Sequence, residues 1–214
     1  MFNLPPSTLI NKIVPKNAFD QYTNYRQKRL FSDLVSRIVW LHKISFETVN
    51  LQGKEVQEIQ IFNIELKEKL EIGQIVQIID RAVPYHIIFV VGFEEERYIS
   101  VSAKHLHPQN DDKAVIDYTF TSEWFEKDEN SYQIVLKGSL DHVFKDFCKQ
   151  FTSNYLKENK TISEVVDMQK KIDRLMKDIE NVKSAKKKKK QFNRKVELNM
   201  NLKNLEETLL NILK

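Results

Sequence analysis

Glycine, proline and cysteine are scarce in this chain of 214 residues, which contains four, five and one of them. No glycine or proline follows Gly138, so the last third lacks the residues that usually break helices and form flexible linkers. We therefore expect continuous helix or helix pairs there. The single cysteine, Cys148, excludes an internal disulfide and a zinc site built from several cysteines. Its neighbours at helical spacing are phenylalanines, which predicts a buried, small hydrophobic side chain.

Long apolar runs are absent as well. The longest, residues 87–91, is far too short to span a membrane. The N-terminus lacks the basic region followed by an apolar stretch that is typical of a secretory signal. From these two absences we expect a cytoplasmic protein that does not enter a membrane.

Positive charge is concentrated in one stretch, residues 183–195, which has eight basic residues and no acidic one. The whole chain carries only +4, so the other residues sum to −4. The basic residues of this run are Lys183, Lys186, Lys187, Lys188, Lys189, Lys190, Arg194 and Lys195. Such a run predicts sequence-independent contact with the DNA backbone or with an acidic partner. A solvated run at a helix C-terminus is the simpler alternative.

Apolar residues at steps of three and four lie on both sides of the lysine run. The first seam is Ile162, Val165, Met168, Ile172, Leu175, Ile179 and Val182, and the second is Leu198, Leu202, Leu205, Leu209 and Ile212. The two seams are out of phase, and the break falls at the lysines, which disfavours one straight coiled coil. We predict an antiparallel coiled-coil hairpin over residues 157–214 with a basic tip, which could also join two copies of the chain.

Residues 1–156 alternate between helical and strand patterns, which predicts an α+β or α/β domain with a mixed sheet and flanking helices. Predicted helices are 8–13, 17–43, 71–83 and one starting at Ser139; predicted strands are 44–51, 56–66, 85–92, 97–103 and 132–136. The first two strands, around Gly53, predict a β-hairpin. A strand, a helix and a wholly apolar strand over 56–92 predict a βαβ unit.

Glu65-Leu66-Lys67 ends the second predicted strand and is the sharpest candidate for chemistry. A Glu-x-Lys on a strand that precedes a helix and another strand is the arrangement of PD-(D/E)XK nucleases. Alternation puts Glu65 and Lys67 on one face, where the carboxylate could hold Mg²⁺ and the amine could stabilise a phosphate. Glu47 and Glu55 are the acids nearest to it on a preceding strand. Charges continue after Lys67, so a solvated strand end is the alternative.

Three further groups are weaker candidates. His105 and His107, with Asp111 and Asp112, fit a metal site or a polar loop. Asp80 and His86 flank Pro84; we expect Asp80 in solvent at a helix end and His86 buried in a strand. Trp124 and Phe125 fit core or edge packing better than base stacking, because no basic residues alternate with them.

Several segments together resemble a known family. They are 15–16 (Pro-Lys), 38–40 (Ile-Val-Trp), 58–62 (Glu-Ile-Gln-Ile-Phe), 80–89, 121–125 and 191–199. They resemble a bacterial domain family of unassigned function whose genes often lie beside helicases and DNA methyltransferases in restriction-like phage-defence loci. The resemblance implies a DNA-defence context and a helicase or methyltransferase partner, and it implies no catalytic residue. We therefore expect a non-catalytic accessory or scaffold subunit; a Mg²⁺-dependent nuclease and a structural coiled-coil dimer are the alternatives.

Overall fold

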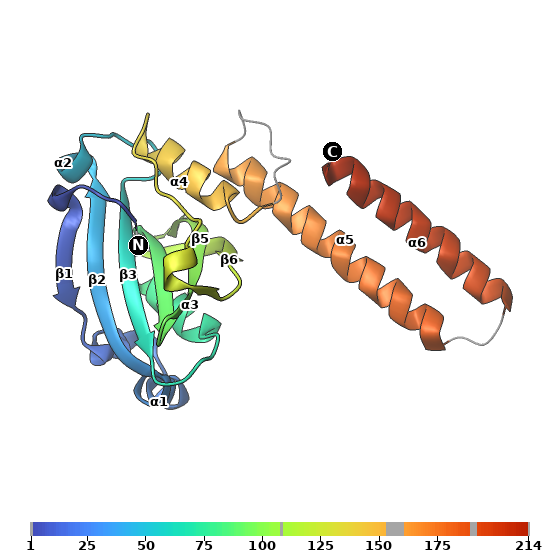
Figure 1. The fold of residues 1–214 in the computed structure, drawn as a ribbon, viewed down its shortest axis with the longest axis horizontal. Helices are drawn as coiled ribbons and strands as arrows, with labels where there is room; N and C mark the ends of the chain where they lie inside the picture. Colours follow the sequence, from blue (N-terminus) through green and yellow to red (C-terminus); the bar gives the residue numbers. More distant parts are fainter. Residues whose placement is uncertain (1, 108, 153–160, 189–191, 214) are drawn as a thin grey trace. The chain divides into compact units, whose positions relative to one another are not determined.

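The computed structural model describes residues 2–107, 109–152, 161–188 and 192–213 (Figure 1). The chain divides into two compact units, Met1–Phe151 and Thr152–Lys214. We call them the sheet unit and the helical unit. No helix among the described residues is long and apolar enough to cross a membrane.

The sheet unit is a mixed α+β structure built on a sheet of seven strands. Its strands are β1 (Leu9–Ile13), β2 (Val35–Ser45), β3 (Glu58–Leu66), β4 (His86–Phe93), β5 (Glu96–His107), β6 (Asn110–Thr121) and β7 (Phe125–Glu126). Its helices are η1 (Pro6–Thr8), η2 (Lys16–Tyr22), α1 (Tyr25–Leu34), α2 (Phe46–Val49), α3 (Gly73–Ala82), η3 (Lys127–Glu129) and α4 (Leu140–Lys149). The strands lie in the order β1-β2-β3-β4-β5-β6, and β7 pairs with β5.

Only β3 and β4 are parallel neighbours; the other pairs are antiparallel. The parallel pair is joined by α3, so the predicted βαβ unit is confirmed. Its helix buries Ile75, Val76 and Ile79 against Phe62 and Ile64 of β3 and the alternate residues of β4. Burial of these side chains supplies the main core of the unit.

The opposite face of the sheet is covered differently. Because side chains alternate along a strand, Ile61, Asn63 and Glu65 of β3 point away from α3. α4 contacts β3 on this face, and its Phe144 ring lies 4.2 Å from the His86 ring at the start of β4. The remainder of this face, toward the end of β3, carries Asn63 and Glu65 beside the apolar Ile61 and Val90.

The predicted helix over 17–43 is wrong in its second half, because α1 ends at Leu34 and β2 begins at Val35. The apolar residues there are largely β-branched, and Val35, Ile38 and Ile44 are almost fully buried in the sheet. Such residues lose side-chain freedom in a helix and pack well on a pleated surface. Pairing with β3 therefore outweighs the helical spacing.

Other predicted elements are also corrected. Residues 9–13 form strand β1, and residues 46–49 form a single helical turn, so the antiparallel partner of β3 is β2. Residues 132–136 form no strand, whereas 110–121, for which the sequence predicts no element, form β6. The predicted helix start at Ser139 is confirmed, because the Ser139 hydroxyl accepts from the His142 backbone N–H.

The helical unit contains α5 (Ile162–Lys188) and α6 (Phe192–Leu213). The two helices contact each other, and Lys183 Nζ of α5 lies 3.1 Å from Glu206 Oε1 of α6. The chain is therefore helical on both sides of the lysine run.

Candidate functional site

The polar part of the sheet face contains a cavity of about 230 Å³, which we call the sheet-face pocket. Its polar lining residues are His42, Asn63, Glu65, Arg97 and Lys127. They come from β2, β3, β5 and η3, so the sheet itself brings them together. Of the predicted catalytic residues, only Glu65 lies here.

Arg97 crosses the pocket floor and is fixed by backbone groups. Its Nη1 donates to the carbonyls of Glu94 and Glu96, at 2.6 and 2.7 Å. The side chain lies over Gly92, where an added Cβ would be only 2.6 Å from Arg97 Cζ. A larger residue at position 92 would therefore displace the Arg97 side chain from this position.

Glu65 is held by its neighbours on the same face. Asn63 Nδ2 donates to Glu65 Oε1 at 2.9 Å, and Arg97 Nη2 lies 3.6 Å from the same oxygen. The Glu65 carboxylate therefore faces the Arg97 guanidinium, whose residue is only 8% exposed, and the two opposite charges partly cancel. Its negative charge serves to position Arg97.

His42 is held by a side chain from the N-terminal segment. The Thr8 hydroxyl lies 2.7 Å from the Pro5 carbonyl oxygen and is hydrogen-bonded to His42 Nδ1 at 2.9 Å. Burial lowers the pKa of His42, which favours the neutral ring. A neutral imidazole has one donor and one acceptor nitrogen, so His42 brings a polar, uncharged side chain to the pocket.

The other predicted nuclease residues lie elsewhere. Lys67 Nζ donates to the Ser32 carbonyl in α1 at 2.6 Å, and Lys67 does not line the pocket. Glu47 follows the end of β2 that pairs with Glu58, and it contacts Lys43 at 3.2 Å. Glu65 lies at the other end of β3 from Glu58, a separation of about 23 Å at 3.3 Å per residue of strand. The structure does not bring Glu47 and Glu65 together.

Glu55 is no nearer. Its backbone N–H donates to Asp141 at 2.8 Å, in the loop before β3. Among the described residues, Glu65 is the only carboxylate that lines the pocket, and it already faces Arg97. Within the described residues, no group of three His, Cys, Asp or Glu side chains could hold a metal ion. The residues present do not fit a Mg²⁺ site.

A second polar cluster is buried at the end of α3. Lys104 Nζ donates to Asp80 Oδ1, to the Asp80 carbonyl and to the Val83 carbonyl at 2.7, 2.7 and 2.8 Å. These three acceptors use all three protons of an ammonium group. Burial raises the pKa of Asp80 and lowers that of Lys104, while each partner opposes the shift of the other. The Asp80–Lys104 pair lies at the C-terminal end of α3. Asp80 is therefore buried, and the expectation that it faces solvent is wrong.

His86 lies beside this cluster, buried as predicted. Burial lowers its pKa to about 4, and the charge of Lys104 acts in the same direction. No local pattern indicates that Lys104 is buried, because its partner Asp80 lies in another element, α3. An aspartate within the apolar run of α3 was the only available hint of a buried cation.

The remaining candidates have structural contacts. His105 Nδ1 lies 2.9 Å from Asp117 Oδ2 across β5 and β6, while the side chains of His107, Asp111 and Asp112 lie outside the described ones. The Trp124 ring packs edge-on to Tyr98 at 4.8 Å. Cys148 is fully buried, and burial raises its pKa.

The basic run spans the facing ends of two helices. Lys183, Lys186, Lys187 and Lys188 belong to the last turns of α5, and Arg194 and Lys195 to the first turn of α6. Lys189 and Lys190 lie outside the described residues. Cations favour a helix C-terminus but oppose the dipole at an N-terminus. Helix stability therefore explains the lysines of α5 and leaves Arg194 and Lys195 unexplained.

Comparison with known proteins places the chain in a family. No curated protein and no solved structure matches it significantly. A family model matches residues 2–209, which include both the sheet unit and the helical unit. The chain therefore belongs to the family described as domain of unknown function (DUF4391).

Proposed function

We propose that the protein is a non-catalytic accessory subunit of a bacterial DNA-processing defence complex and acts in the cytoplasm. In this proposal its partner is a helicase or DNA methyltransferase, and residues 183–195 contact the DNA backbone without sequence preference. The observation that carries the DNA contact is the position of the run, where basic residues occupy both facing helix ends. The partner class rests on the resemblance to domains encoded in defence loci.

We also infer that α5 and α6 form an antiparallel coiled-coil hairpin with the lysines at its tip. The out-of-phase apolar seams, the contact between the helices and the Lys183–Glu206 ion pair support this arrangement. A tip of this kind would present its charge to a phosphate backbone while the seams stay covered.

The test is a DNA-binding titration at several salt concentrations. Replacement of Lys186–Lys190 with glutamine removes up to five phosphate contacts, each worth about 0.9 in the slope of log K against log salt. We expect weaker binding and a flatter slope. The matched control replaces five exposed cations of the same unit outside the run: Lys170, Lys171, Arg174, Lys177 and Lys203. Equal losses in both variants would contradict a local contact.

A Mg²⁺-dependent nuclease acting through Glu65 and Lys67 is the second candidate. The βαβ unit of β3, α3 and β4 favours it, whereas the described lining of the sheet-face pocket does not fit Mg²⁺. Its test is DNA cleavage with Mg²⁺ or Mn²⁺ by the wild type, Glu65→Gln and the exposed control Glu68→Gln. Cleavage lost only in Glu65→Gln would support it. No cleavage, or equal cleavage by all three, would reject it.

A structural dimer joined through the helical unit is the third candidate. Sedimentation of the full chain over a range of concentrations distinguishes it, since a functional dimer persists on dilution. A monomer at all concentrations would reject it, and isolation of a stable helicase or methyltransferase complex would support the accessory role.

A further inference from the structure

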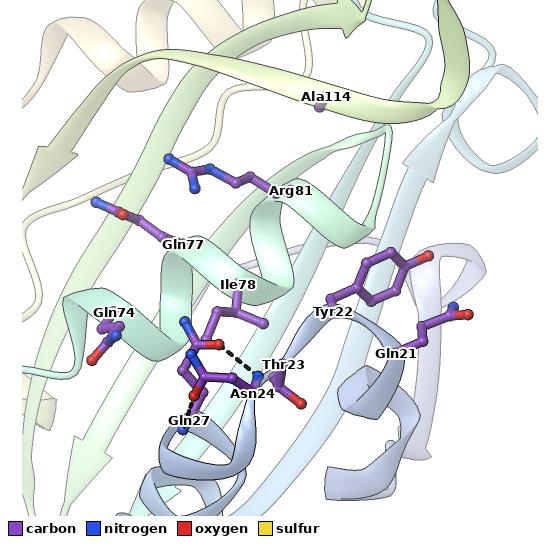
Figure 2. Close-up of a pocket in the computed structure, with 10 residues that line it drawn as sticks. All are labelled: Gln21, Tyr22, Thr23, Asn24, Gln27, Gln74, Gln77, Ile78, Arg81 and Ala114. Atoms are coloured by element: carbon purple, nitrogen blue, oxygen red, sulfur yellow. Dashed lines mark hydrogen bonds between the residues drawn. The ribbon is translucent and has the colours of Figure 1, made fainter.

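A larger hollow lies on the sheet unit, between η2, the start of α1, α3 and β6 (Figure 2). Its volume is about 660 Å³, and amide side chains dominate its lining. We call it the amide groove; its principal residues are Tyr22, Asn24, Gln27, Gln74, Gln77 and Arg81. Among the described residues of the lining, Arg81 is the only charged one and none is a carboxylate.

Two amides at the floor of the groove have fixed orientations. Asn24 Oδ1 accepts from the Gln27 backbone N–H at 3.0 Å, and Gln27 Oε1 accepts from the Asn24 backbone N–H at 2.9 Å (Figure 2). A backbone N–H can only donate, so the atoms facing it must be the oxygens. Both NH₂ groups therefore remain as donors, and the capping box that starts α1 holds them in place.

The opposite wall is one face of α3. Gln74, Gln77 and Arg81 are spaced by three and four residues, so they lie along the same side of the helix. The other side buries Ile75, Val76 and Ile79, which fixes the rotation of α3 and keeps the polar side exposed. Tyr22 stands across the groove from this wall, with 37% of its surface exposed (Figure 2).

We propose that the amide groove binds a nucleoside phosphate. Arg81 and the two oriented NH₂ groups donate to the phosphate, while Gln74 and Gln77 pair with the edge of the base. Glutamine offers both a donor and an acceptor, which is the pattern that base edges require. The Tyr22 ring offers a surface on which a base can stack.

The size and charge of the groove favour this ligand over others. Small-molecule sites typically measure about 300–1,000 Å³. A cationic ligand would meet Arg81, and no described residue of the lining offers it a carboxylate. An apolar ligand would leave the amides without partners. The proposal does not depend on residues 183–195, so the DNA contact proposed above can fail while this one holds.

The experiment is a titration of the full-length protein with dAMP, inorganic phosphate and a single-stranded oligonucleotide of about 12 nucleotides. We expect dAMP to bind more tightly than phosphate, because the base contributes its own contacts. Arg81→Gln should weaken dAMP binding roughly fivefold, the loss of one charge-assisted hydrogen bond at an open site. Gln77→Ala should reduce the preference of dAMP over phosphate.

The matched control is Arg37→Gln, which removes the same charge from an exposed position on β2. It should bind dAMP like the wild type, as should a variant with Lys186–Lys190 replaced by glutamine. Two results distinguish the source of the nucleotide. If the oligonucleotide binds tightly and Arg81→Gln weakens its binding, the ligand is a nucleic-acid chain. If dAMP binds and the oligonucleotide does not, the ligand is a free nucleotide. Either outcome supports the site. No binding at millimolar dAMP, or equal binding by wild type, Arg81→Gln and Gln77→Ala, would overturn it.

Discussion

The two units of the chain differ in the sign and in the use of their charge. Residues 1–151 contain 18 basic and 21 acidic residues, whereas residues 152–214 contain 16 and 9. In the sheet unit, Lys104, Asp141 and Arg97 are each held by backbone groups. In the helical unit, eight cations follow one another without an acid. Charge of the first kind holds the fold together, and charge of the second kind is free to act on a partner.

This comparison predicts opposite consequences for similar substitutions. Removing a charge of the sheet unit that backbone groups hold should lower the free energy of unfolding and leave the proposed contact of residues 183–195 with DNA unchanged. Removing a charge of the lysine run should weaken DNA binding and leave the free energy of unfolding nearly unchanged. The following predictions are ordered by the expected size of the stability effect.

Lys104→Met should have the largest effect. It leaves Asp80 buried without its cation and removes the donor from two carbonyls at the end of α3. Loss of one partner from a buried ion pair typically costs about 3–5 kcal/mol. Urea unfolding measures the difference, with exposed Lys137→Met as control. A loss below about 1 kcal/mol would show that this charge is not structural.

His86 should make stability depend on pH in a defined window. Its folded pKa is about 4, below the ordinary 6.5, so the unfolded chain binds the proton first as pH falls. Stability is therefore complete above pH 6.5 and declines as pH falls toward 4, by up to about 3 kcal/mol. Unfolding measured across this window should show a smaller slope for His86→Gln.

Asp141 connects the start of α4 to the loop before β3. Its carboxylate accepts from the backbone N–H groups of Lys54, Glu55 and Val56 at 2.7, 2.8 and 2.9 Å. Asp141→Ala should cost about 2 kcal/mol at neutral pH, whereas the exposed control Asp128→Ala should cost almost nothing.

Asp141 also makes stability depend on pH. Its hydrogen bonds favour the charged carboxylate, whereas burial disfavours the charged form of His86. Burial by itself raises the pKa of Asp141, but the three backbone hydrogen bonds outweigh it and bring the pKa below its ordinary value. The stabilisation is present above the unfolded pKa of about 4 and is lost as pH falls through the lower folded pKa. The stability difference between wild type and Asp141→Ala should therefore shrink below pH 4. A difference that stays constant there would rule out the carboxylate as its cause.

Sequence patterns are sufficient to predict the secondary structure where the local spacing of apolar residues agrees with the tertiary packing. The βαβ unit follows from an amphipathic helix before an apolar strand, and the buried α3 and β4 confirm it. They were insufficient at 35–45, where the apolar spacing fits a helix while pairing with β3 selects a strand. The sequence pattern does not predict β6, because the first half of this strand is as polar as a loop. Pairing with β5 makes it a strand.

The candidate sites were harder to predict for a related reason. Glu65 was found because its motif is contiguous, but its partner Arg97 comes from a strand 32 residues later. His42 reaches the same pocket from β2, and its ring is hydrogen-bonded to the hydroxyl of Thr8. The amide groove combines residues from η2, α1 and α3. None of these combinations can be read from spacing, because the sheet register and helix rotation create them.

Lys183 gives the smallest stability effect and the sharpest contrast with Lys104. Its side chain is 54% exposed and its Nζ lies 3.1 Å from Glu206, which is 49% exposed. Exposed ion pairs contribute about 0–1 kcal/mol, so Lys183→Gln should leave the urea midpoint nearly unchanged. If Lys183 touches a phosphate, the same variant should flatten the salt slope of DNA binding by about 0.9. Glu206→Gln removes the same ion pair and keeps the lysine, so it should preserve or strengthen DNA binding. Equal DNA binding by both variants would mean that Lys183 serves the helix pair, and the division between structural and available charge would then fall closer to Lys186.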